Sequence, residues 1–140
     1  MAYVEGALGE KIQELMEESN KQYGMRNYER SIQLLIDAWN ELPDEKYPYD
    51  ESFLIIWGIL DTAILIKDVG IMNTWVDKIF YADPERRDSG EREMWAGRVA
   101  FESDDKDKAL EYFNIANKKS RGRCFLTKDE KYKKFLLSEK

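Results

Sequence analysis

The sequence predicts an all-α protein, and three observations support this. Apolar residues recur at three- and four-residue spacing along most of the chain, which is the period of an α-helix. Only 3 Pro and 8 Gly interrupt the 140 residues. No stretch alternates apolar and polar residues between turn pairs, as a half-buried strand would. Because 43% of the residues are hydrophobic, the chain has enough apolar mass to bury a core.

Seven helices are expected, each from an apolar face and a start or stop signal. The first four are expected at about 7–23, 28–42, 51–67 and 70–82, and Gly24, Pro43 and Pro84 are the signals that end the first, second and fourth. Residues 43–49 form the one clear loop of this part.

The last three helices are expected from start signals in the second half of the chain. The pairs Asp88–Glu91 and Thr127–Glu130 have the spacing of a capping box, in which each side chain satisfies a free amide of the first turn. The polar turn 104–107 opens the helix between them. The final helix is short, with Tyr132 and Leu136 on its apolar face.

The third helix is apolar nearly all round, which is typical of a helix buried between neighbours. Asp61 is the acid within it, and two interpretations are open: an ion-pair partner for a base such as Arg98, or an acid in a binding groove. We favour the ion pair because a lone buried carboxylate is costly. The four tryptophans fall one per helix and are expected to be core anchors, with one in four reaching a binding surface: Trp39, Trp57, Trp75 and Trp95.

A skeleton of small and apolar residues repeats along the chain, in copies offset by 41 and then 37 residues. Its second-helix positions are Ser31, Leu35 and Ala38; Met72, Val76 and Ile79; and Ala109, Phe113 and Ala116. Gly58 and Gly97 precede the second and third sets, and Ser19 stands in the corresponding place of the first. Small residues at these places let two antiparallel helices cross closely.

This skeleton resembles the tetratricopeptide repeat (TPR), with its Gly, Ala-x-x-x-Phe, Ala and Pro pattern. The resemblance implies one domain over residues 1–140, with repeats at about 12–44, 52–85 and 90–120. The antiparallel hairpins would stack as a short superhelix, and a C-terminal helix at about 126–138 would cap the last apolar face.

The resemblance also implies that the first helix of each hairpin lines a concave groove. The groove positions it nominates are Met16, Asn20, Tyr23, Ile55, Ile59, Thr62, Glu91, Met94, Arg98 and Phe101, with Gln13 and Ser52 beside them. Such a mixture of Met, aromatic and charged side chains suits an extended or helical peptide. The alternative is that the groove is folded shut, with Ile55, Ile59 and Phe101 as ordinary core.

The charge is unevenly distributed along the chain. The net charge is −6, with 14 acids against 6 bases in residues 1–70 and 14 against 16 in residues 71–140. A basic patch is expected at Lys118, Lys119, Arg121 and Arg123. The segment 118–134 could hold a phosphate or RNA strand, with Phe125 and Tyr132 as stacking faces, although the acidic body argues against nucleic acid. A basic end and an acidic body would also let copies associate head to tail.

Neither catalysis nor a cofactor is expected. The chain has no His, so the commonest general base and metal ligand is missing, and its 1 Cys forbids an internal disulfide. No nucleophile with a base, phosphate-cradling glycine loop or metal constellation stands out, so we expect neither an enzyme nor a metal site. No apolar run reaches 18 residues, so the expected location is the cytoplasm and no membrane partner is expected.

These features favour a protein–protein interaction module, either an adaptor or a chaperone-like protein, that binds a protein or peptide in its concave face. A sharper hypothesis is a bacterial immunity or secretion-chaperone protein, because a small acidic protein suits masking a basic toxin or effector. The rival hypothesis is a nucleic-acid or phosphate-ligand binder that uses the basic C-terminal end. The residues do not identify the partner.

Overall fold

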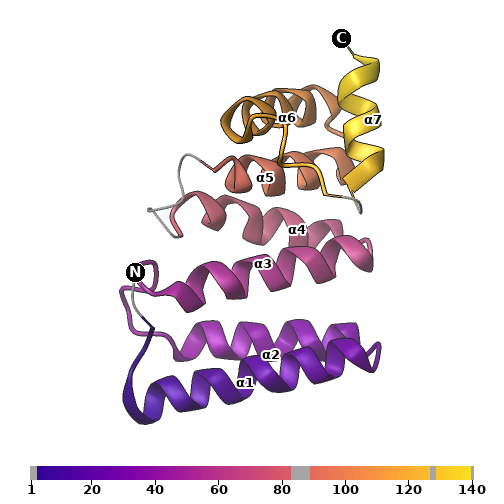
Figure 1. Ribbon diagram of the computed structural model, residues 1–140. Coiled ribbons are helices and arrows are strands. Elements are labelled where there is room, and N and C mark those ends of the chain that lie inside the picture. Colours follow the sequence, from indigo (N-terminus) through magenta and orange to yellow (C-terminus); the bar gives the residue numbers. More distant parts are fainter. Residues whose placement is uncertain (1–2, 83–88, 127–128, 140) are drawn as a thin grey trace. The chain divides into compact units, whose positions relative to one another are not determined.

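The computed structural model describes residues 3–82, 89–126 and 129–139 (Figure 1). This part of the chain holds seven α-helices, one short 3-10 helix and no β-strand, so the prediction of an all-α protein is confirmed. The chain divides into two compact units, residues 1–85 and 86–140. The first contains the two expected hairpins 12–44 and 52–85, and the second contains the hairpin 90–120 and the final helix.

The first unit consists of two helical hairpins. Its elements are α1 (Gly6–Gly24), α2 (Tyr28–Glu41), α3 (Asp50–Leu65), α4 (Val69–Trp75) and the 3-10 helix η1 (Val76–Phe80). Helix α2 packs against both α1 and α3, and α3 packs against α4 and η1. The core is built from the apolar faces that the periodicity predicts, with Ile12, Ile56, Leu60 and Ile79 fully buried.

The second unit is one hairpin and a final helix: α5 (Glu91–Glu102), α6 (Lys106–Ser120) and α7 (Glu130–Ser138). Phe113 of α6 is at the centre, with the rings of Phe125 and Tyr132 at 5.8 and 5.5 Å from it, centre to centre. Gly97 lets α5 approach this ring, because a Cβ atom there would lie 2.5 Å from Phe113 Cδ1. Tyr132 and Leu136 of α7 are buried in the same cluster, as expected for a capping helix.

All three hairpins turn in the same way. Arg26, Lys67 and Asp104 adopt positive φ angles of 65°, 59° and 62°, which residues other than Gly and Asn rarely do. In each hairpin the residue after this one is the N-cap of the second helix: Asn27, Asp68 or Asp105. The backbone N–H of each N-cap residue donates to the carbonyl of the residue five positions earlier, at 2.9 Å. The three turns are 41 and 37 residues apart, which are the offsets of the sequence skeleton.

The turns correct the alignment of the second hairpin. Counting back from each turn, Leu60 holds the position that Ser19 and Gly97 hold in the other hairpins, and Gly58 lies two residues earlier. A Cβ atom on Gly58 would meet Leu35 of α2 at 2.8 Å, so this glycine relieves the contact with the preceding hairpin. The match of Gly58 to Gly97 was therefore wrong.

The fourth helix also differs from its prediction. It is α-helical only to Trp75 and then narrows to a 3-10 helix. The side chains of Asn73 and Thr74 donate to the carbonyls of Val69 and Gly70, at 2.9 and 2.8 Å, where they compete with the helical backbone bonds.

Three predicted start or stop signals of helices lie outside the described residues: Pro84, Asp88 and Thr127. The described start of α5 uses Ser89, whose hydroxyl accepts from the Glu91 N–H at 3.2 Å.

Candidate functional site

Helices α1 and α3 lie side by side and run in the same direction. At their starts, the Val4 N–H donates to Glu51 Oε2 at 2.8 Å. At their ends, the Tyr23 hydroxyl donates to Asp61 Oδ2 at 3.3 Å. Helix α2 packs against both of these helices, and Figure 1 shows its ribbon between theirs.

The shared turn geometry defines which positions of α1 and α3 correspond to one another. Positions of α1 and α3 correspond when they lie the same number of residues before Arg26 and Lys67. By this count, the α3 residues Leu54, Trp57, Asp61 and Ile64 correspond to Gln13, Met16, Asn20 and Tyr23 of α1. We call these eight residues the α1–α3 face. Trp57 and Tyr23 are exposed, by 42% and 38%, and the other residues of α3 in the set are half-buried. Each of the two helices therefore exposes a large aromatic side chain, and the Tyr23–Asp61 hydrogen bond links the two sets of positions.

The structure corrects the predicted groove residues of the second hairpin. Ile55, Ile59 and Thr62 are buried in the structure, and the Thr62 hydroxyl donates to the Gly58 carbonyl at 2.7 Å. They were chosen by aligning on Gly58, which shifts the stripe by two residues, about 200° around a helix. The alternative that Ile55 and Ile59 are core fits their burial. In the first hairpin Asn20 and Tyr23 are exposed and Met16 is half-buried.

The predicted groove residues of the third hairpin are mostly occupied within their own unit. Met94 and Arg98 are buried, and Glu91 and Phe101 are half-buried. Arg98 donates to Asp129 from Nε at 3.1 Å and from Nη2 at 2.8 Å. Arg98 is thus paired with Asp129 inside the second unit, and Asp61 accepts from Tyr23 inside the first. Phe101 packs edge-on against Tyr132 at 5.2 Å between ring centres.

The basic patch is partly neutralised by nearby acids. Lys118, Arg121 and Arg123 are exposed at the end of α6, where the helix dipole favours cations. Lys119 instead pairs with Glu93 at 3.1 Å. The expected stacking faces are not available, because Tyr132 is buried and donates to Glu102, and Phe125 packs on Phe113.

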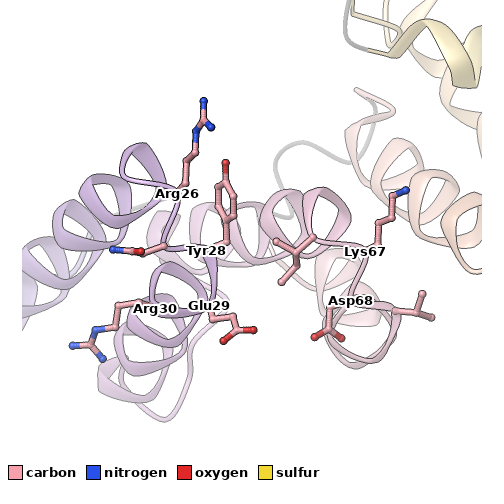
Figure 2. Close-up of a pocket in the computed structure, with 9 residues that line it drawn as sticks. Arg26, Tyr28, Glu29, Arg30, Lys67 and Asp68 are labelled. Atoms are coloured by element: carbon pink, nitrogen blue, oxygen red, sulfur yellow. The ribbon is translucent and has the colours of Figure 1, made fainter.

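A hollow of about 780 Å³ lies between the turns of the first two hairpins (Figure 2). Three bases line it, but Figure 2 shows Arg26, Arg30 and Lys67 pointing away from one another. The carboxylates of Glu29 and Asp68 point into the gap instead, so the hollow presents no converging cations to an anion.

Neither the cysteine nor the carboxylates form a reactive centre among the described residues. Burial raises the pKa of the Cys124 thiol, which keeps it in the less nucleophilic protonated form. No three His, Cys, Asp or Glu side chains in the described ranges are placed to hold a metal ion. Within the same ranges, every helix is too short or too polar to cross a bilayer.

No protein-family model matches the chain, and neither a curated protein nor a solved structure matches it. Sequence reasoning missed Leu54, Trp57 and Ile64 as members of the exposed face. Their spacing to Lys67, the residue with positive φ at the turn, identifies them. It equals the spacing of their α1 counterparts to Arg26, and each lies 41 residues after its counterpart.

Proposed function

We propose that this chain is a small TPR-like repeat protein of the cytoplasm that binds another protein through the α1–α3 face and carries out no chemistry itself. The observation that carries the proposal is the exposure of Trp57 next to Tyr23 and Asp61. All four tryptophans lie within the described residues, and Trp39, Trp75 and Trp95 are buried while Trp57 is 42% exposed. Of the four tryptophans, Trp57 is thus the one whose ring leaves a large area for a partner to cover.

The composition of the face supports a protein partner. Tyr, Trp and Met are enriched at protein interfaces, where a few aromatic anchors supply most of the binding free energy. Trp57, Tyr23 and Met16 provide such anchors, and Asn20 and Gln13 provide hydrogen-bonding groups beside them. An adaptor or a chaperone-like protein fits this description, and an immunity or secretion-chaperone role is the sharper form of the same proposal.

The rival function is binding of a nucleic acid or phosphate ligand at Lys118, Arg121 and Arg123. Three exposed bases favour it, and the buried Tyr132 and the internally paired Lys119 weigh against it. Single-stranded nucleic acid binding combines bases with open aromatic faces, and Tyr132 and Phe125 are both engaged in packing.

Site-specific photocrosslinking distinguishes the two functions. Benzoylphenylalanine is placed at position 57, at position 118, or at position 137, whose leucine is exposed on α7 and serves as the control. Each full-length variant is irradiated in the source cells, and the products are analysed by mass spectrometry with and without nuclease treatment.

We expect one discrete protein adduct from position 57 and none from position 137. Nuclease-sensitive adducts from position 118, with none from position 57, would replace the proposed function with its rival. Equal adducts from positions 57 and 137 would show that the α1–α3 face is ordinary surface.

A further inference from the structure

We infer that the partner segment that docks on the α1–α3 face is cationic, with lysine or arginine side chains among apolar ones. This inference rests on the proposed function and specifies the chemistry of the partner. It follows from the charge of the first unit, from the acids at the face, and from the positions of the bases of that unit.

The first unit is strongly acidic. Residues 1–85 hold 17 acids against 7 bases, a net charge of −10, whereas residues 86–140 hold 11 acids against 15 bases, a net charge of +4. The excess in the first unit includes the exposed acids of α1, which are Glu10, Glu14, Glu17 and Glu18. A surface of one sign raises the encounter rate with partners of the opposite sign.

One acid of the face, Asp61, and one acid beside it, Glu17, are held by hydrogen bonds. Gln13 donates to Glu17 Oε1 at 3.3 Å, which holds that carboxylate next to the α1 positions of the face. Tyr23 donates to Asp61 Oδ2 at 3.3 Å, which holds the second carboxylate between the two helices. Trp57 is one helical turn before Asp61, so an indole ring and a carboxylate lie on the same side of α3. A cation above the ring gains from both, through a cation–π contact and an ion pair.

Of the seven bases of the first unit, one is paired within the unit and three line the hollow. Lys11 pairs with Glu41 of α2 at 2.9 Å, and Arg26, Arg30 and Lys67 line the hollow at the turns. None of the eight residues of the face is itself a base. Met16, Leu54 and Ile64 add partly buried apolar area, which favours a segment with aliphatic side chains beside its charges.

Fluorescence anisotropy with defined peptides tests the inference on the full-length chain. The first probe is a fluorescein-labelled 18-residue peptide of Leu and Lys with a helical repeat. The second has Glu for every Lys, and the third has Ser for every Leu. We expect the Leu/Lys peptide to bind at least about tenfold more tightly than either of the others, a difference of about 1.4 kcal/mol.

Matched variants locate the binding. Two variants should each weaken binding of the Leu/Lys peptide by about fivefold or more. One is Trp57→Ala, and the other, called the charge variant, combines Glu17→Gln with Asp61→Asn. Asp37→Asn is the charge control, because Asp37 accepts from Gln33 at 3.0 Å on α2 in the same arrangement as Glu17 and Gln13. Leu137→Ala is the apolar control. Both controls should bind like the wild type, and circular dichroism checks that each variant is folded; Trp57→Phe replaces Trp57→Ala if the latter unfolds.

Three outcomes overturn the inference. Equal affinity for the Lys and Glu peptides, together with crosslinking from position 57, would leave the proposed function standing without a cationic partner. A loss of binding free energy in Asp37→Asn about half as large as in the two-charge variant would show attraction by net charge alone. A dimer in sedimentation equilibrium that Trp57→Ala dissociates would make a second copy of the chain the occupant of the face. If no adduct forms at position 57 and no peptide binds, both proposals fail.

Discussion

Ser19 and Ser31 join α1 to α2 by exchanging hydrogen bonds with each other's backbone. Ser19 Oγ donates to the Ser31 carbonyl at 2.8 Å, and Ser31 Oγ donates to the Ser19 carbonyl at 2.9 Å. Both side chains are buried. Small size lets the two helices cross closely here, as glycine does in the third hairpin, and the two hydroxyls add a polar contact that glycine could not make.

Removing either hydroxyl should destabilise the first hairpin. Ser19→Ala or Ser31→Ala is expected to lower the free energy of unfolding by about 1 kcal/mol, because each loses one buried hydrogen bond. The two hydroxyls are also 2.9 Å apart, so the double variant should lose less than the sum of the single losses. Urea unfolding followed by circular dichroism measures all three. Strict additivity would show that the two bonds are independent.

Gly97→Ala should destabilise the second unit by about 1–3 kcal/mol, because the added Cβ would lie 2.5 Å from the ring of Phe113. That ring is fully buried against Phe125, Tyr132 and Phe135, so it has no room to retreat. Gly24→Ala is the matched control, since nothing lies within 4 Å of its Cβ position. The control should be neutral or slightly stabilising in the same urea assay. A neutral Gly97→Ala would show that the helix crossing tolerates a methyl group.

The helices and their pairing could be predicted from the sequence because the apolar period and the turn residues act locally. The expected helices 28–42 and 51–67 match α2 and α3 within two residues at each end. The two-residue shift in the second hairpin could not be found in this way. Gly58 resembles Gly97 in the sequence, and only the contact of Gly58 with Leu35 shows that it serves a different helix pair.

The candidate site was predicted less completely, because exposure depends on which elements cover a side chain. Arg98 is polar and follows the groove spacing, yet its partner Asp129 is 31 residues away and no local pattern links the two. Trp57 lies in a helix that is apolar nearly all round, so periodicity could not distinguish its exposed side from its buried side. Trp57 is the one tryptophan of the four that is exposed, and that it lies on a binding surface stays a prediction.

Removing one charge of the buried Arg98–Asp129 pair should lower the free energy of unfolding more than removing both charges together. Asp129→Asn or Arg98→Met alone is expected to cost about 3–5 kcal/mol, because each leaves an uncompensated charge or an unsatisfied donor in the interior. Asp129 also accepts from the Leu126 N–H at 3.0 Å, so it fixes the entry to α7.

The double variant Arg98→Met with Asp129→Leu removes both charges and is expected to be more stable than either single variant in urea. A double variant that loses the sum of both single costs would contradict this, since the pair would then contribute no mutual interaction.

The phenol of Tyr132 should make stability fall at alkaline pH. Burial, and next its hydrogen bond to Glu102 at 2.8 Å, raise the pKa of Tyr132 above its ordinary value of 10.0. The phenol ionises near pH 10 in the unfolded chain and stays protonated at that pH in the folded one. The stability that the protonated phenol contributes to the folded state is therefore fully present below about pH 10 and is lost as the pH rises further. Urea unfolding at pH 8 and pH 11 measures the change. The Tyr132→Phe variant has no phenol at this position and serves as the reference. Relative to it, the free energy of unfolding of the wild type should fall by about 1.4 kcal/mol between pH 10 and pH 11. An unchanged difference at the two pH values would show that the phenol ionises equally in both states.

Acrylamide quenching should detect Trp57 selectively. Trp57 is 42% exposed while Trp39 and Trp75 are each 8% exposed, so most of the quenchable emission should come from one residue. Trp57→Phe is expected to abolish the strongly quenched component and shift the remaining emission to shorter wavelength, whereas Trp39→Phe should leave that component in place. In the wild type, saturating Leu/Lys peptide should protect the same component, because a segment on the α1–α3 face covers the indole ring. Protection that persists in Trp57→Phe would place the peptide elsewhere on the molecule.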